Sequence, residues 1–242
     1  MRETSSGMAA SAGSLKVLSA GAVKRGVAQI AKAFERATGT RVSVEFHTAP
    51  ELRKLVAAGE TADVVVAPPA AMDDFQKLGR IDPASRGFVG RSRMGVVVHA
   101  GAPVPDLSDT AAFRRALTAA STVVYNKASS GIYAAKLMEK LGLDKALGAK
   151  IVVVDTGSAI MEYVAAQPPG AVGLAQISEV MVLIDKGCAV KLAAPLPDGI
   201  QNVTSYDAAA FAGSPSLDAA RKLAANLTSD AAKKVFAATG IS

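Results

Sequence analysis

The chain has 242 residues, half of them hydrophobic, which is enough for the core of one large domain or two small domains. Trp is absent and aromatic residues make up 5%, so Ala, Val and Leu must do most of the packing. The formal charge of +6 comes from scattered Lys and Arg with no run of five, which argues against a nucleic-acid-binding stripe and is compatible with an anionic ligand.

The hydrophobic pattern alternates between strands and helices along the chain. In the first predicted helix, residues 22–37, the apolar residues Val23, Val27, Ile30 and Phe34 recur at helical spacing and define one face. Strands are expected at residues 15–19, 41–46, 63–67, 90–99, 122–125, 150–154, 171–175 and 189–194. Helices are expected at residues 22–37, 51–58, 70–78, 109–119, 131–141, 158–166 and 216–241. This alternation predicts an α/β fold with mostly parallel sheets flanked by helices.

Two such α/β sets follow each other, joined by extended segments near residues 86–98 and 194–204. We therefore expect two lobes joined by two crossing strands. Residues 1–14 are expected to form a disordered N-terminus, residues 15–88 with 200–242 the first lobe, and residues 89–199 the second. Ligands of open α/β sheets bind beyond the carboxyl ends of the strands, so a cleft between hinged lobes is the expected site.

A small-residue loop, Asn126-Lys127-Ala128-Ser129-Ser130-Gly131, lies between a predicted strand and a predicted helix. It brings hydroxyl groups and backbone N–H groups to a helix N-terminus, which favours a bound anion. Ser129 and Ser130 are therefore candidate ligand-binding residues, although simple helix capping also explains a Ser there. Thr156-Gly157-Ser158 opens another predicted helix, and capping by Asp155 or Thr156 explains that segment equally well.

Other polar residues lie near predicted strand ends. Thr48, before Ala49 and Pro50, is a candidate either for ligand binding or for capping. Arg91 and Arg93 share one face of the first crossing strand, and either guanidinium suits a carboxylate; the alternative is a solvated hinge strand. His47 and Lys127 are weaker candidates for ligand contact.

Metal and catalytic motifs are missing from the sequence. One cysteine, Cys188, and two distant histidines, His47 and His99, form no metal-ligand cluster, so we expect no metal and no cofactor. Cys188 is expected to be a buried structural thiol. No paired carboxylates and no Ser-His-Asp arrangement can be argued, so no catalytic residue is assigned. No stretch of 18 consecutive apolar residues occurs, so no transmembrane helix is expected.

Several segments together resemble the type II periplasmic solute-binding proteins of ABC transporters, in particular the molybdate-binding branch. The similar segments are Val17-Leu18-Ser19-Ala20-Gly21-Ala22-Val23, Phe46-His47-Thr48-Ala49-Pro50-Glu51-Leu52, Ser130-Gly131-Ile132-Tyr133-Ala134 and Gly173-Leu174-Ala175-Gln176-Ile177-Ser178-Glu179. The resemblance extends from residue 15 to residue 241. It implies the two-lobe fold of periplasmic-binding-protein type II.

The resemblance also implies a pocket built from several loops. The oxyanion-binding positions of the family fall at Ala22, at Thr48 or Ala49, at Ser130, near Ser158 and at Gln176. Ala22 has no hydroxyl and Gln176 replaces a family Tyr, so recognition of molybdate by hydroxyl groups is in question. Combined with Arg91, Arg93 and Ser129, which were selected above from strand spacing and loop chemistry, the expected ligand-binding set is Gly21, Ala22, Thr48, Ala49, Arg91, Arg93, Ser129, Ser130, Gly157, Ser158 and Gln176. This set suits a small carboxylate or another oxyanion.

The resulting hypothesis is a solute-binding protein that captures a small anion in the cleft for an ABC-type importer. It would act as a monomer, with the anion and an ABC permease as partners and no nucleic acid. The alternative is a cofactor-free isomerase of an unsaturated tricarboxylate, because aconitate isomerases share this resemblance. The N-terminus lacks the apolar core of a secretion signal, so the expected location is periplasmic if a signal was removed and cytoplasmic otherwise.

Overall fold

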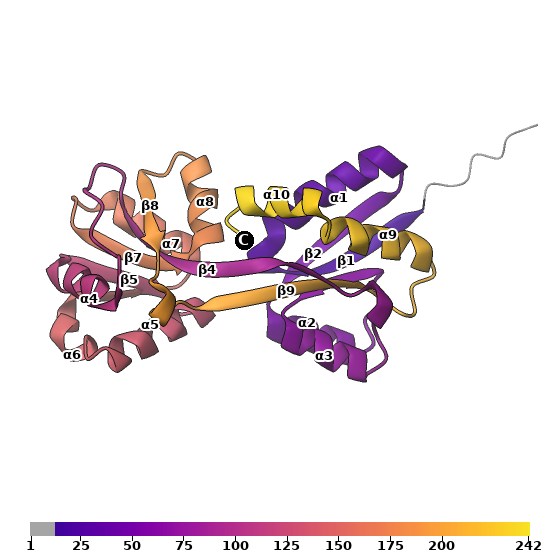
Figure 1. Cartoon of the computed structure of the whole chain (residues 1–242), viewed down its shortest axis with the longest axis horizontal. Helices are drawn as coiled ribbons and strands as arrows, with labels where there is room; N and C mark the ends of the chain where they lie inside the picture. Colours follow the sequence, from indigo (N-terminus) through magenta and orange to yellow (C-terminus); the bar gives the residue numbers. More distant parts are fainter. Residues whose placement is uncertain (1–12) are drawn as a thin grey trace, which may run out of the picture. The chain divides into compact units, whose positions relative to one another are not determined.

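The computed structural model describes residues 13–242, and these form two compact units (Figure 1). The first unit comprises residues 13–88 and Asp207–Ala232, and the second comprises Val89–Tyr206 and Lys233–Ser242. Residues 200–206 and 233–242 thus group with the second unit, whereas the sequence-based division had placed them in the first. The expected disordered N-terminus lies outside the described residues except for Gly13 and Ser14, and Ser14 already begins a strand.

In the first unit, three parallel strands and one antiparallel strand pair in the order β2-β1-β3-β9. The strands are β1 (Ser14–Ala20), β2 (Arg41–His47), β3 (Val64–Ala67) and β9 (Val203–Ala210). The helices are η1 (Gly21–Val23), α1 (Lys24–Thr38), α2 (Ala49–Ala57), α3 (Pro69–Lys77), η2 (Pro83–Ser85) and α9 (Leu217–Leu227). Helices α1 and α9 cover one face of this sheet, and α2 and α3 cover the other (Figure 1).

In the second unit, the strand order is β4-β7-β5-β6, with β8 paired to β4. The strands are β4 (Gly87–His99), β5 (Thr122–Asn126), β6 (Ile151–Val154), β7 (Ala171–Gln176) and β8 (Val190–Pro195). The helices are α4 (Thr110–Ala119), α5 (Ser129–Lys140), α6 (Asp144–Leu147), η3 (Gly148–Lys150), α7 (Gly157–Ala166), α8 (Ile177–Asp185) and η4 (Asp198–Ile200). Strands β5, β6 and β7 run parallel, whereas β4 is antiparallel to both β7 and β8.

Alternating residues of the second unit's strands build two separate cores. Val96 and Val98 of β4 pack with Phe113 of α4 and Leu137 of α5 in one cluster. Val97, between them, belongs to a second cluster with residues of α7 and α8. Because successive side chains of a strand point to opposite faces, helices α4, α5 and α6 cover one face of the sheet and α7 and α8 the other.

Two strands contain residues of both units. The chain passes from the first unit to the second within β4, between Phe88 and Val89, and returns within β9, between Tyr206 and Asp207. A third passage lies inside α10 (Asp230–Ala238), between Ala232 and Lys233. The mostly parallel sheets with flanking helices agree with the expected α/β fold.

Three predicted features differ from the structure. The helix expected over residues 216–241 is two helices, α9 and α10, because Ser229 between them uses its hydroxyl to accept from the backbone N–H of Ala232 at 3.2 Å. Helix α8 was not predicted, since its nearly continuous apolar run does not distinguish a helix from a buried strand. Cys188 is half-buried rather than fully buried, and its Sγ lies 3.7 Å from the carbonyl oxygen of Met161.

Candidate functional site

In the first unit, the predicted residues meet where β1 and β2 end side by side. Ala20 is the register partner of His47, so Gly21 and Ala22 continue past one strand end while Thr48 and Ala49 continue past the other. A Cβ added to Gly21 would lie 4.0 Å from the carbonyl oxygen of His47. Neither η1 nor α1 has a side-chain cap at its start, so the donors there are the backbone N–H groups.

Thr48 caps helix α2. Its hydroxyl accepts from the backbone N–H of Glu51 at 3.4 Å, while its own N–H donates to Glu51 Oε2 at 2.7 Å. These two bonds form a reciprocal capping box. The Thr48 hydroxyl also donates to Glu51 Oε2 at 2.9 Å, and the hydrogen bonds from the N–H and the hydroxyl of Thr48 to this carboxylate lower the pKa of Glu51. The capping interpretation of Thr48 is therefore observed in the structure.

His47 lies beside this loop. It is half-buried, and its Nε2 is 3.6 Å from Glu45 Oε2, beyond hydrogen-bonding range. That buried nitrogen has no hydrogen-bond partner among residues 13–242. Its position at the end of β2 keeps His47 among the candidate residues.

In the second unit, the loop before α5 is organised by Asn126, a residue that sequence analysis did not select. The side chain of Asn126 is buried, and its Oδ1 accepts from the backbone N–H groups of Ala128 and Gly131, both at 3.1 Å. It also accepts from the hydroxyl of Ser130 at 3.3 Å. The hydroxyl of Ser130 is thus engaged inside the loop. An Asn at the end of a buried strand and just before a helix start is the signal that could have identified it.

Ser129 differs from Ser130. It is the first residue of α5 and is exposed, and Ala128 before it provides no side-chain cap. The N-terminus of α5 therefore presents backbone donors and one hydroxyl toward solvent, with a neutral carboxamide beneath them.

Helix α7 is capped by Thr156, a side chain of the loop that precedes it. Thr156 Oγ1 accepts from the N–H of Ala159 at 3.2 Å and lies 3.1 Å from the hydroxyl of Ser158. Lys127 Nζ donates to Asp155 at 2.7 Å, which lowers the pKa of Asp155 and connects this loop to the α5 loop. Both side chains are exposed, so this pair contributes little to stability.

A third loop follows β7. Gln176 Oε1 accepts from the hydroxyl of Ser92 on β4 at 2.6 Å, leaving its amide nitrogen as the donor end. Ser178, 6% exposed, has a hydroxyl without a hydrogen-bond partner in the described part of the chain. Glu179, in the first turn of α8, places its carboxylate directly against Gly157, where a Cβ would collide with it. Sequence analysis missed Ser92, Ser178 and Glu179 as site residues because no local pattern connects these positions.

Arg91 and Arg93 lie on β4, which pairs with β7 at the same edge of the sheet. They share a face with Gly95, where an added Cβ would lie 3.0 Å from Ile177 at the start of α8. Arg91 is exposed, whereas the Nε of Arg93 is buried without a hydrogen-bond partner among residues 13–242. All the second-unit candidates, from Arg91 to Gln176, are therefore gathered at one edge of one sheet.

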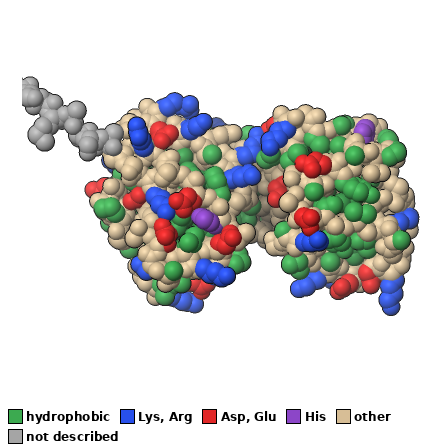
Figure 2. Space-filling model, turned by 180° about the vertical axis from the view of Figure 1, so that it is seen from behind, with side chains coloured by type: hydrophobic (Ala, Val, Ile, Leu, Met, Phe, Trp, Pro, Cys, Tyr) green, Lys and Arg blue, Asp and Glu red, His purple; other side chains and the backbone are tan. Residues whose placement is uncertain are grey.

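Two other surface features of the described chain include none of the candidate residues or no continuous charge. A surface hollow of about 600 Å³ lies between α4 and residues 142–146, lined by Arg114 and Arg115 among others, but none of the candidate residues lines it. On the face drawn in Figure 2, basic side chains are interspersed with acidic ones on each unit, and they form no continuous stripe.

Residues 13–242 contain no group of three or more His, Cys, Asp or Glu side chains arranged to hold a metal ion. Over the same residues, every helix is too short or too polar to cross a membrane.

Comparison with known proteins relates the chain to one sequence family. The family of bacterial extracellular solute-binding proteins matches residues 15–242. An aconitate isomerase from Pseudomonas sp is 30% identical over 241 residues, covering 94% of this chain and 87% of that protein.

Solved structures share the fold. A substrate-binding domain assigned to a molybdenum ABC transporter of Clostridium difficile has a TM-score of 0.78 at 17% identity, covering 94% of this chain and 97% of its own. The periplasmic molybdate-binding protein of Azotobacter vinelandii has a TM-score of 0.68 at 17% identity, covering 94% and 98%. The sulfate-binding protein of Mycobacterium tuberculosis H37Rv has a TM-score of 0.66 at 18% identity, covering 95% and 86%.

These matches confirm the expected fold and the resemblance to type II solute-binding proteins. Since the family match spans nearly the whole described chain, the protein belongs to the bacterial extracellular solute-binding proteins.

Proposed function

We propose that this protein binds a small anion, an organic acid or an oxyanion, at the strand-end edge of its second unit and delivers it to an ABC-type permease. The observation that carries this proposal is the start of α5, where Ser129 is exposed, the cap residue Ala128 makes no side-chain hydrogen bond, and the buried side chain that accepts from Ala128 and Gly131 is the neutral Asn126. A helix N-terminus with free N–H groups and no acidic cap attracts negative charge. Membership of a solute-binding family supports the same function.

Further donors surround that helix end. The amide nitrogen of Gln176, the loop carrying Gly157 and Ser158, and the guanidinium groups of Arg91 and Arg93 belong to the same sheet edge. In the first unit, the backbone N–H groups of Gly21 and Ala22 and the loop at Thr48 and Ala49 provide a second set. Both sets suit carboxylate or oxyanion oxygens, which accept hydrogen bonds only.

The sharpest test compares Ser129→Glu with Ser129→Gln. A Glu in the first turn favours the helix, so the fold should be retained, but its charge occupies the position proposed for the anion. We expect Ser129→Glu to weaken anion binding at least tenfold. Ser129→Gln introduces a side chain of the same shape as Glu but without its charge, so it should change the affinity much less.

Ligands would be found by melting-temperature shifts with molybdate, tungstate, sulfate, phosphate and di- and tricarboxylates. An anion at a hundred times its dissociation constant should stabilise the fold by about 2.7 kcal/mol. If none of these anions raises the melting temperature, or if the Glu and Gln variants bind equally well, the proposal is wrong.

A second candidate function is isomerisation of aconitate, and the relative at 30% identity favours it. In that reaction a base removes an allylic proton from a CH2 group, the double bond shifts, and a proton is returned to the other carbon. The enzyme needs no cofactor for this step, only cationic groups for the carboxylates and one acid/base. Arg91, Arg93, Lys127 and His47 are the candidates for these roles.

Proton NMR of trans-aconitate incubated with the protein distinguishes the two functions. Appearance of cis-aconitate, absent with heat-denatured protein, would identify an isomerase. Stabilisation by an anion that stays chemically unchanged would identify a binding protein.

We also infer that the protein works outside the cytoplasmic membrane, as the family description suggests, and that it acts as a monomer. Light scattering at micromolar concentration should give a mass near 24.6 kDa.

A further inference from the structure

Gln176, the last residue of β7, lies beside the strand end that leads into α5. In the adjacent parallel strands β7 and β5, Gly173 is the register partner of Val124. Strand β7 ends three residues further on at Gln176, and β5 ends two residues further on at Asn126, so the two ends lie level to within one residue. Leu174, two residues before Gln176, packs in the same core cluster as α5. Because residues two apart on a strand share a face, the Gln176 side chain is on the face of the sheet that α5 covers.

The carboxamide of Gln176 is held by Ser92 of β4. Ser92 lies two residues before Met94, the register partner of Gln176 in the antiparallel pair of β4 and β7. It is fully buried, and its hydroxyl donates to Gln176 Oε1 at 2.6 Å. This hydroxyl makes no other hydrogen bond within residues 13–242. A carboxamide turned the other way would place its NH2 group against Ser92 and leave the buried hydroxyl proton without an acceptor, which is unfavourable.

The opposite end of the carboxamide is therefore fixed as a hydrogen-bond donor. Gln176 is half-buried, and its amide nitrogen is neither fully buried nor hydrogen-bonded within residues 13–242. An NH2 group of this kind donates and does not accept. The ligand atom that contacts it must therefore be an acceptor, such as a carboxylate or oxyanion oxygen.

We propose that Ser92 is a positioning residue of the anion site, which holds the Gln176 carboxamide with its NH2 group toward the ligand and so requires an acceptor oxygen at that position. This inference rests on the proposed anion-binding function. The hydroxyl of Ser92 is buried and already bonded to Gln176, so Ser92 acts through that side chain. Its effect is preorganisation, because the carboxamide is oriented before the anion arrives and binding does not have to order it.

A double-mutant cycle of Ser92→Ala and Gln176→Ala tests this role by isothermal titration calorimetry. The probes are sulfate, molybdate, phosphate and tricarballylate, a saturated tricarboxylate with no double bond for an isomerase to shift. Gln176→Ala should weaken binding about tenfold or more, because it removes a hydrogen bond to a charged oxygen. Ser92→Ala should weaken binding about three- to tenfold, the cost of ordering one side chain. In the Gln176→Ala background, Ser92→Ala should change the affinity by less than about twofold.

Ser214→Ala is the matched control. Ser214 is a buried residue of the first unit, and its hydroxyl also donates to a side-chain oxygen, Asp63 Oδ1. Asp63 directly precedes β3, at the end of that strand opposite to the strand ends that carry the candidate residues. Ser214→Ala should lower the melting temperature and leave the anion affinity unchanged.

A purely structural Ser92 would give a different result. If Ser92→Ala weakens binding by the same factor with and without Gln176, or does not weaken it, this inference is wrong while anion binding stands. The same holds if Gln176→Ala binds the probes as well as the wild type does. If the wild type binds none of the probes and no anion raises its melting temperature, both this inference and the proposed function are wrong.

Discussion

At the scale of single residues, the carboxamide of Asn126 organises the anion-binding loop that we propose. One buried oxygen accepts two backbone N–H groups and one hydroxyl, so three donors of the loop converge on it. The backbone N–H and the hydroxyl of Ser129 are not among these three donors. A positioning role of this kind makes a clear thermodynamic prediction.

Asn126→Ala should destabilise the protein by about 2–4 kcal/mol, because it leaves buried N–H groups without acceptors. Ser130→Ala, which removes only one donor to the same oxygen, should cost about 1 kcal/mol or less. Urea unfolding of both variants measures the difference. Equal losses for the two variants would show that Asn126 does not hold the loop.

The raised pKa of Tyr206 predicts that the protein loses stability in alkaline solution. Its pKa is about 12 in the folded protein and about 10 in an unfolded chain, so between these values only the unfolded state has lost the phenolic proton. The unfolded state then binds fewer protons, and stability falls as pH rises; the contribution is complete below pH 10 and is lost by about pH 12.

Between pH 9 and pH 11, the wild type should therefore lose about 1 kcal/mol more than Tyr206→Phe, as measured by chemical denaturation. Tyr125 and Tyr133, whose pKa values burial also raises, are common to both proteins and cancel. If the free energy of unfolding falls equally with pH in the wild type and in Tyr206→Phe, the raised pKa of Tyr206 is wrong.

At the scale of elements, two helices of the second unit begin against different kinds of neighbour. A Cβ on Gly131 in α5 would overlap the backbone carbonyl of Asn126, whereas a Cβ on Gly157 in α7 would meet only the end of the Glu179 side chain. Backbone at the end of a buried strand cannot move aside, but a side-chain tip can rotate. The first helix start is therefore rigidly determined and the second is adaptable.

Gly131→Ala should accordingly destabilise the fold by at least about 2 kcal/mol, and Gly157→Ala by less than about 1 kcal/mol. Thermal unfolding of the two variants, which make the same chemical change, provides the comparison. A Gly131→Ala protein as stable as Gly157→Ala would refute the proposed difference between the two helix starts.

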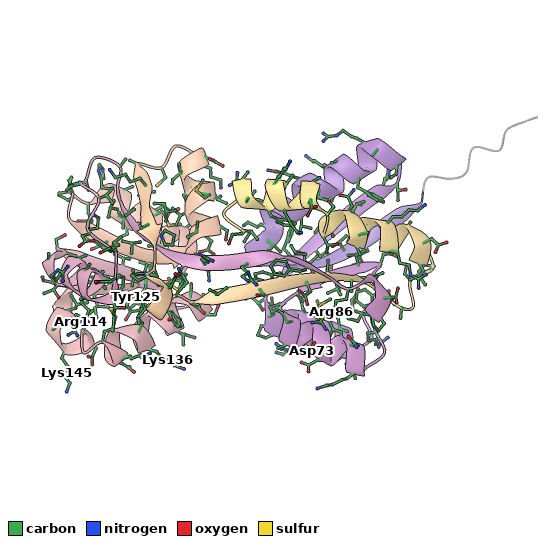
Figure 3. All side chains as sticks on the ribbon, in the orientation of Figure 1. Asp73, Arg86, Arg114, Tyr125, Lys136 and Lys145 are labelled. Carbon is green, nitrogen blue, oxygen red and sulfur yellow. The ribbon has the colours of Figure 1, made fainter. Side chains whose placement is uncertain are left out.

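At the scale of the whole molecule, the first unit is built from two distant stretches of chain, and Arg86 connects them. Its guanidinium donates to Asp207 of β9 from Nε at 2.9 Å and to Asp73 of α3 from Nη1 at 2.7 Å. Asp73 and Arg86 are labelled in Figure 3. The side chains of Arg86 and Asp207 are only 20% and 14% exposed, so solvent screens this pair weakly.

Arg86→Met should cost about 2 kcal/mol, because it leaves Asp207 partly buried without its cation. Arg53→Met is the matched control, since Arg53 pairs with Asp74 at 2.8 Å where both side chains are at least 40% exposed, and it should cost less than about 1 kcal/mol. The free energies of unfolding of the two variants measure this difference. If both variants lose the same stability, Arg86 is not needed to connect the two stretches of the first unit.

Most local features of this protein were predictable from the sequence. The apolar face of α1, the helix start after β5, the alternative that Thr48 caps α2, and the α/β alternation all follow from periodicity and capping chemistry within a few residues. Burial of a helix face or a strand face repeats with a short period, so neighbouring residues suffice to reveal it.

The contacts that shape the candidate site depended on tertiary structure. The antiparallel return of β9, the break between α9 and α10, and the approach of Glu179 to Gly157 join residues that share no local pattern. Strand order decides which loops meet, and it results from the packing of the whole sheet rather than from any one segment. The sequence by itself therefore determined the fold class and the helix starts that suit an anion, while only the tertiary structure decided which of those starts has a side chain from another helix packed against it.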